Sequence, residues 1–84
     1  MANLPQISGK KLCKAVEKEG FVFVRQTGSH RIYQKKSEEG NITIPIPVHS
    51  NRPLKKGTLH NILKKTGITR EKLVFLLALL MKLH

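Results

Sequence analysis

Aspartate is absent from the sequence and glutamate occurs five times, against 16 lysines and arginines, so the 84-residue chain carries a formal net charge of +11. Two-metal phosphodiesterases hold their ions with clustered carboxylates. Here only Glu38 and Glu39 are neighbours, in a segment whose composition predicts a turn. We therefore expect no metal ion or other cofactor. The charge favours a polyanionic partner: nucleic acid, an acidic protein or an anionic membrane surface.

Cysteine and long hydrophobic runs are also scarce. The single cysteine, Cys13, cannot form an internal disulfide, which is typical of a protein from a reducing compartment, and we expect it to fill the core. The first residues lack the basic start and apolar run of a signal peptide. The longest apolar run, residues 73–81, would span roughly 14 Å as a helix, less than half of a bilayer core. We expect a cytoplasmic protein without a transmembrane segment.

The hydrophobic pattern predicts one domain over residues 1–84. In chain order it predicts a helix from Ser8 to about Glu19, strands over 21–24, 31–35 and 42–49, and helices over 58–66 and 70–82. Strands joined by hairpins, with helices over one face, make a two-layer α+β domain. Pro45 and Pro47 cannot donate ladder hydrogen bonds, so the third strand is predicted to be an edge strand or one that ends irregularly.

The histidines are the candidates for proton transfer. RNA cleavage needs little more than acid–base chemistry beside a held phosphate, because the substrate's own 2′-hydroxyl is the nucleophile, and histidine suits both proton-transfer roles. His84 is terminal, and we expect His60 to be a solvated residue of the second helix. A hairpin turning at residues 38–40 places His30 opposite about residue 48, at the same end of the sheet as His49. We rank His30 first as the catalytic residue and His49 second, as its acid–base partner or a phosphate ligand.

Basic side chains and exposed amides accompany His30. Strict alternation would place His30 on the core face, but it adjoins a turn, where alternation need not hold. The Gly28-Ser29 turn, flanked by Arg25 and Arg31, fits a phosphate. Lys55 and Lys56, followed by Gly57 at the start of the second helix, form a second anion site, with a solvated charged loop as the alternative.

Together these motifs resemble the HicA (YcfA-like) family of toxins over residues 8 to about 73. The motifs that carry the resemblance are Ser8-Gly9-Lys10, Glu19-Gly20-Phe21, Arg25-Gln26-Thr27-Gly28-Ser29-His30, Ile44-Pro45-Ile46-Pro47-Val48-His49, Leu54-Lys55-Lys56-Gly57-Thr58-Leu59, Ile62-Leu63-Lys64 and Gly67-Ile68.

The resemblance implies a fold like the double-stranded-RNA-binding domain, with a three-stranded antiparallel sheet and two packed helices. It implies ribosome-independent mRNA cleavage by the toxin of a type II toxin–antitoxin system. The catalytic histidine of the family falls on His30. A HicB-like antitoxin is the implied partner, covering that site. A non-catalytic RNA-binding module of the same fold is the alternative function, and a protein-interaction module docking an acidic partner is a third.

An additional apolar helix over residues 74–84 departs from the family pattern. A helix that is apolar all round cannot bury every face against one small domain. Three roles are open for it: extra core with a homodimer contact, a larger antitoxin interface, or association with a membrane surface.

Overall fold

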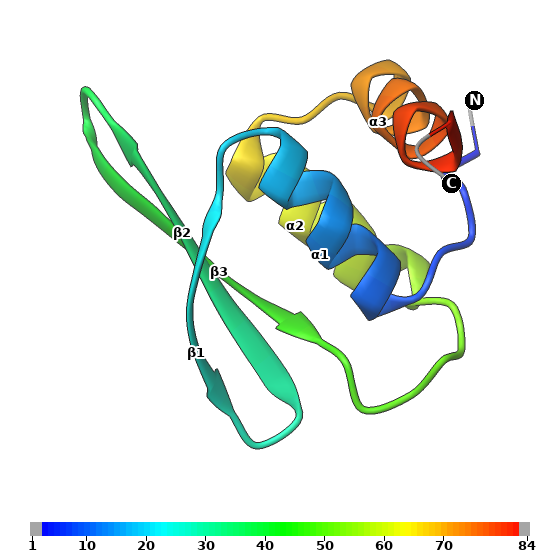
Figure 1. Cartoon of the computed structure of the whole chain (residues 1–84), viewed down its shortest axis with the longest axis horizontal. Helices are drawn as coiled ribbons and strands as arrows, with labels where there is room; N and C mark the ends of the chain where they lie inside the picture. Colours follow the sequence, from blue (N-terminus) through cyan, green and yellow to red (C-terminus); the bar gives the residue numbers. More distant parts are fainter. Residues whose placement is uncertain (1–2, 83–84) are drawn as a thin grey trace.

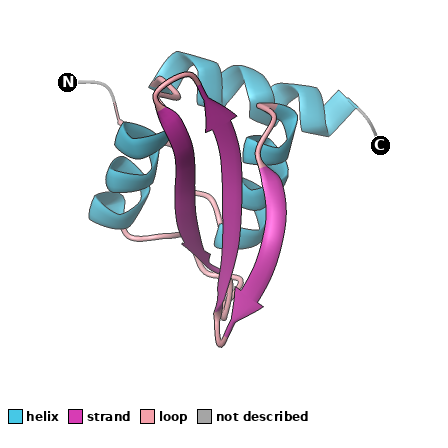
Figure 2. Ribbon diagram, turned by 90° about the vertical axis from the view of Figure 1, so that its left-hand side faces the viewer, coloured by secondary structure: helices cyan, strands magenta, loops and turns pink. Residues whose placement is uncertain are grey.

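Residues 3–82, the part of the chain that the computed structural model describes, form three helices and a three-stranded antiparallel sheet of order β1-β2-β3. The helices lie on one side of the sheet and the opposite face is open (Figures 1 and 2). The predicted α+β class and element order are therefore confirmed. The elements are α1 (Gly9–Lys18), β1 (Val22–Thr27), β2 (His30–Ser37), β3 (Gly40–Pro47), α2 (Lys56–Thr66) and α3 (Arg70–Lys82).

Helix ends follow the capping residues of the sequence. The Ser8 side chain accepts a hydrogen bond of 3.2 Å from the amide of Lys11 at the start of α1, and Thr69 does the same for Lys72 in α3 at 3.0 Å. Gly67 ends α2 in the left-handed region, with φ of +75°. These caps were predicted, although α2 begins at Lys56, two residues before the predicted start.

The strands place Tyr33 in the core, and its direction decides the direction of His30, three residues earlier on β2. Tyr33 is 1% exposed among buried side chains that include Ile44 and Ile46, and its hydroxyl donates to the Glu17 carboxylate at 2.5 Å. Since Tyr33 faces the helices, the odd-numbered positions of β2 are the inner ones. His30 therefore points to the open face by ordinary alternation; the exposed position agrees with its proposed role, but the premise that strict alternation would turn it inward was wrong.

β3 is an edge strand, as its prolines predicted. It pairs only with β2 among the described strands, and His30 lies opposite Pro47, one residue from the expected partner. The end of β3 passes so close to α1 that a β-carbon on Gly9 would lie 1.6 Å from the carbonyl oxygen of Pro47. Only glycine fits at this crossing, which fixes the start of α1 against the end of β3.

α3 packs against α1 on the side away from the sheet (Figure 1). Leu73 and Leu76 are buried, and Lys72 forms an ion pair with Glu19 at 3.4 Å. Val74, Phe75 and Met81 remain 44%, 55% and 74% exposed. No helix within residues 3–82 is long and apolar enough to cross a membrane. His84 and the end of the predicted extension lie outside the described residues.

Candidate functional site

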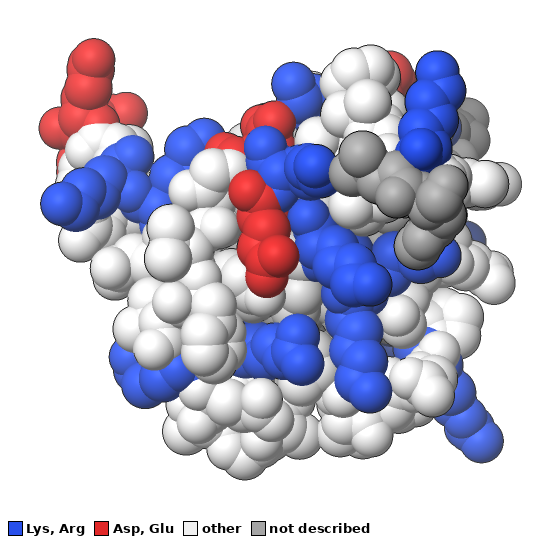
Figure 3. Space-filling view, in the orientation of Figure 1, with Lys and Arg blue, Asp and Glu red and all other residues white. Residues whose placement is uncertain are grey.

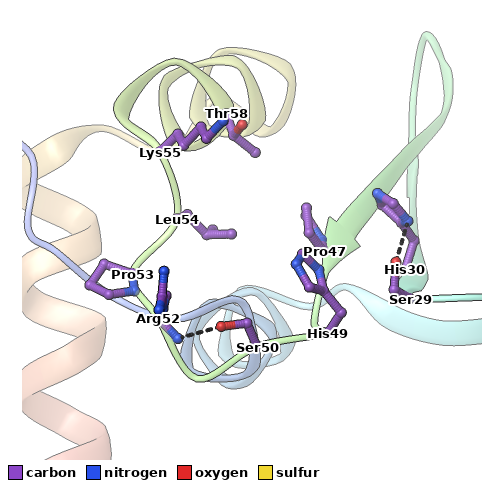
Figure 4. Close-up of a pocket in the computed structure, with 10 residues that line it drawn as sticks. All are labelled: Ser29, His30, Pro47, His49, Ser50, Arg52, Pro53, Leu54, Lys55 and Thr58. Carbon is purple, nitrogen blue, oxygen red and sulfur yellow. Dashed lines mark hydrogen bonds between the residues drawn. The ribbon is translucent and has the colours of Figure 1, made fainter.

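A hollow of about 460 Å³ opens where β2 begins and β3 ends (Figure 4). One wall is the sheet and the other is the loop from β3 to the start of α2. This loop is tied back to the segment before α1, because the amide of Leu54 donates to the carbonyl of Ile7 at 2.8 Å. The hollow is lined by Ser29, His30, Pro47, His49, Ser50, Arg52, Pro53, Leu54, Lys55 and Thr58.

His30 is held at the hollow by the turn that precedes it. Gly28 has φ of +57°, which favours glycine, and the Ser29 carbonyl accepts a 2.8 Å hydrogen bond from the amide of Val48. That bond fastens the β1–β2 turn to the end of β3. The Ser29 hydroxyl lies 3.5 Å from Nδ1 of His30 (Figure 4). The imidazole is solvent-exposed on a fixed backbone, as a proton-transfer group needs to be.

His49 lines the same hollow. It follows Pro47 by two residues, is exposed, and lies beside Pro47 on the side of the hollow (Figure 4). The expectation that His30 and His49 lie at one end of the sheet is therefore confirmed. Two imidazole side chains therefore border one concave surface.

The electrostatics of the hollow favour an anion. Arg52 and Lys55 line it, and it holds no carboxylate among the described residues. Lys55 is the N-cap of α2, where no described side chain caps the helix, so the first-turn amides keep their donors for a ligand. Figure 3 shows basic side chains spread over one face of the molecule, with acidic ones in the middle of that face and at the tip of the β2–β3 hairpin, upper left, where Glu38 and Glu39 form the turn.

The other predicted phosphate ligands lie at different places. Arg25 is exposed and pairs with Ile32 on the open face, outside the lining of the hollow. Lys56 is exposed in the first turn of α2, next to the lining. Arg31 is half-buried on the opposite face of the sheet from His30, where its guanidinium lies near Cys13. The structure thus gathers Ser29, the two histidines and Lys55, while Arg31 faces the helices.

Arg52 was missed by the sequence reasoning, together with Ser50 and Thr58. The Ser50 hydroxyl accepts a 2.9 Å hydrogen bond from the amide of Arg52, which shapes the loop so that Arg52 borders the hollow. The available signal was position in the chain. Arg52 lies in the short basic loop between His49 and Lys55, and both of these residues line the hollow. A residue between them in the chain is therefore expected to lie near the same hollow.

A polar cluster lies behind the sheet, away from the hollow. Burial raises the pKa of the Cys13 thiol, although the Tyr33 hydroxyl and the Arg31 guanidinium both oppose that shift. Burial, followed by the hydrogen bond to Glu17, raises the pKa of Tyr33 above its ordinary value. Cys13 is fully buried, so the prediction that it fills the core is confirmed. Both groups stay protonated at neutral pH, which suits packing rather than nucleophilic chemistry.

Comparison with known proteins identifies the family. Residues 9–68, well over half of the chain, match the model of the HicA toxin of bacterial toxin–antitoxin systems. The matched segment contains the whole sheet, α1, α2 and all the residues of the hollow, and it ends before α3. A search of curated proteins gives no match. The chain therefore belongs to the HicA family and is the toxin of a toxin–antitoxin system, which implies a cognate antitoxin.

Proposed function

We propose that the protein is a metal-independent endoribonuclease that cleaves mRNA without the ribosome, with His30 as its essential proton-transfer group. The observation that carries this proposal is the placement of an exposed histidine in a basic hollow beside a second histidine. Family membership supports the same activity.

The residues of the hollow divide the work of cleavage. The 2′-hydroxyl of the RNA attacks the neighbouring phosphorus, so one group must accept its proton and another must protonate the leaving oxygen. The Ser29 hydroxyl contacts Nδ1 of His30, which leaves Nε2 for the substrate. His49 borders the same space and is the partner for the second proton transfer. Each well-placed acid–base group contributes about 10²–10⁴-fold to the rate.

Cations beside the histidines hold the phosphate and stabilise its developing charge. Lys55, Arg52 and the free amides at the start of α2 lie next to the histidines. The amides of the Gly28-Ser29 turn are the further donors in this proposal, and Lys56 adds charge at the helix end. Arg25, on the open sheet face, and Arg31, on the face turned toward the helices and away from the hollow, stay predicted RNA ligands. Phosphate contacts position the substrate without reading its sequence.

Cleavage of RNA by the purified protein in EDTA is the direct test. His30→Ala is expected to lower the rate at least about 100-fold, because one acid–base group is worth about 10²–10⁴-fold. His60→Ala is the matched control, since His60 is an exposed histidine of α2 outside the lining of the hollow. Both side chains are exposed, so both variants should melt like the wild type. Undiminished cleavage by a folded His30→Ala variant would contradict the proposal.

The role of His49 is separable by kinetics. As a second acid–base group, His49→Ala lowers kcat and removes one limb of the pH–rate profile. As a phosphate ligand, it raises KM and leaves the shape of the profile unchanged.

A non-catalytic RNA-binding module is the second candidate. The open face of the sheet favours it, because Arg25 and the hydrogen-bonded pair of Gln34 and Thr43 are exposed or half-exposed there. Binding without cleavage, unchanged in His30→Ala, would select this function. Fold alone does not decide between the two.

The hollow is also the proposed docking site of a HicB-like antitoxin. Arg52 and Lys55 border the hollow, and a partner that covers it would shield His30 from RNA. The partner should therefore present acidic residues there. Addition of the cognate antitoxin is expected to stop cleavage at one equivalent.

A further inference from the structure

A second hollow adjoins the first and shares His30, Pro47 and Thr58 with it. It measures about 300 Å³ and runs from the end of β3 along α2. Its remaining lining residues are Ile44, Pro45, Asn61, Ile62 and Lys65. His30 therefore stands at the junction of two hollows, one bordered by the loop with Arg52 and Lys55, the other by the side of α2.

Helical spacing puts the polar groups of the second hollow in one row. Thr58, Asn61 and Lys65 follow one another by three and four residues, so they share one face of α2 over roughly 10 Å. The Asn61 amide carries both donors and acceptors, and Lys65 carries a positive charge. Pro45 and Pro47 supply the apolar surface across from them. This combination suits a base and its phosphate.

We infer that the second hollow is a nucleotide subsite for unpaired RNA, which holds the nucleotide beside the scissile phosphate. The base packs on Pro45 and Pro47, Asn61 hydrogen-bonds the base edge, and Lys65 holds a backbone phosphate. This inference rests on the proposed nuclease function, because it takes the scissile phosphate to lie at His30. It adds unpaired RNA as the substrate class and Asn61 as a residue that determines where the RNA is cut.

The size and charge of the two hollows support this strand path. A volume of about 300 Å³ is at the lower end of small-ligand pockets, which fits one base and not a duplex. Proteins read RNA sequence mainly from unstacked bases in single strands, because the major groove of an A-form helix is too deep and narrow for side chains. Cations lie on both sides of His30, with Arg52 and Lys55 in one hollow and Lys65 in the other.

The chain provides matched controls on the same helix. His60 and Lys64 precede Asn61 and Lys65 by one residue each, yet they line a different hollow together with Leu63 and Arg70. Lys64→Ala removes the same charge as Lys65→Ala from an exposed position of α2. His60→Ala likewise controls for Asn61→Ala.

Binding is measured by fluorescence anisotropy with a short, unstructured, labelled RNA whose 2′-hydroxyls are methylated, so that it cannot be cleaved. Loss of one phosphate contact to a single strand lowers the salt slope by about 0.7, which corresponds to about fivefold weaker binding near 0.1 M salt. We expect this loss for Lys65→Ala and little change for Lys64→Ala. Equal effects of the two variants would overturn the subsite. A blunt-ended duplex of the same sequence should bind more weakly than the single strand, and equal binding would overturn the unpaired substrate class.

Specificity is measured by mapping cut sites on a mixed-sequence RNA. A good bidentate contact to a base edge discriminates by about 1–3 kcal/mol, or about 5- to 150-fold. Asn61→Ala should therefore flatten the wild-type preference, while His60→Ala leaves it intact. If the wild type cleaves RNA and Asn61→Ala cuts at the same sites with the same preference, then Asn61 does not recognise the base. That result would leave the nuclease proposal standing. Lys65-dependent binding without any cleavage would reject the nuclease and, with it, the position of the subsite beside a scissile phosphate, and would leave only an RNA-binding surface.

Discussion

The crossing of α1 over β3 predicts that Gly9→Ala strongly destabilises the protein. A β-carbon at Gly9 would lie 1.6 Å from the Pro47 carbonyl oxygen, whereas real contacts stay beyond 3.0 Å. The backbones would therefore have to separate by about 1.4 Å. Neither atom belongs to a flexible side chain, so the strain passes to the buried face of α1, where Leu12 and Val16 are fully buried. We expect a cost of about 3 kcal/mol, the upper part of the usual range for overpacking.

The measurement is thermal unfolding followed by circular dichroism. At this chain length about 1 kcal/mol corresponds to a shift of about 4–8 °C, so Gly9→Ala should lower the melting temperature by roughly 12–24 °C. Small domains unfold with about 5–15 kcal/mol, so the transition should remain measurable.

Gly57→Ala is the matched control for this experiment. Gly57 also lies in the first turn of a helix, but a β-carbon there meets nothing within 4 Å. Alanine should stabilise α2 by about 0.5 kcal/mol through its higher helix propensity. A Gly9→Ala variant that melts like the wild type, or one that gains stability as Gly57→Ala does, would refute the close approach of α1 and β3.

Three further predictions concern the core and α3. Tyr33→Phe removes a hydrogen bond to a carboxylate and should cost about 1 kcal/mol near neutral pH. The pKa of Tyr33 is raised in the folded protein, so the unfolded chain loses this proton first as the pH rises. The contribution of Tyr33 to the free energy of unfolding therefore falls above the ordinary pKa of 10.0. Urea titrations should show the unfolding free energies of the wild type and Tyr33→Phe approaching each other there. Leu73→Ala should cost about 2–5 kcal/mol because the side chain is fully buried, whereas Val74→Ala, at a 44% exposed neighbour, should cost under about 1 kcal/mol; equal losses would contradict the packing of α3. If α3 forms the predicted homodimer contact, Phe75→Gln with Met81→Gln should reduce the mass seen in sedimentation while the monomer fold persists, since both side chains are exposed.

The packing of α3 changes how its role is best tested. Deleting residues 73–84 would remove Leu73 and Leu76 from the core, so loss of an interface and loss of the fold would be confounded. Substitutions on the exposed side of the helix separate the two effects. The homodimer, the larger antitoxin interface and the membrane-surface association all remain predictions.

Capping and periodicity were enough to predict the element order. The helix caps at Ser8, Gly67 and Thr69 involve only residues within one turn of the cap. Such local hydrogen bonds and left-handed backbone can be predicted from neighbouring residues alone. The predicted turn at residues 38–40 likewise placed His30 and His49 at one end of the sheet, because an antiparallel hairpin fixes which residues face each other.

The faces of the sheet and the lining of the hollows were decided only by tertiary packing. In β2 both Ile32 and Tyr33 are apolar enough for the core, and the structure buries Tyr33, whose hydroxyl donates to Glu17 of α1. That choice turned His30 outward and Arg31 inward. Arg52 and Lys65 came to the two sides of His30 through the path of the loop and the angle of α2. The hydrogen bond between Ser50 and Arg52 is local, but the placement of the loop and of α2 beside the sheet is not. The sequence therefore determined the elements and the histidines, and packing determined what surrounds them.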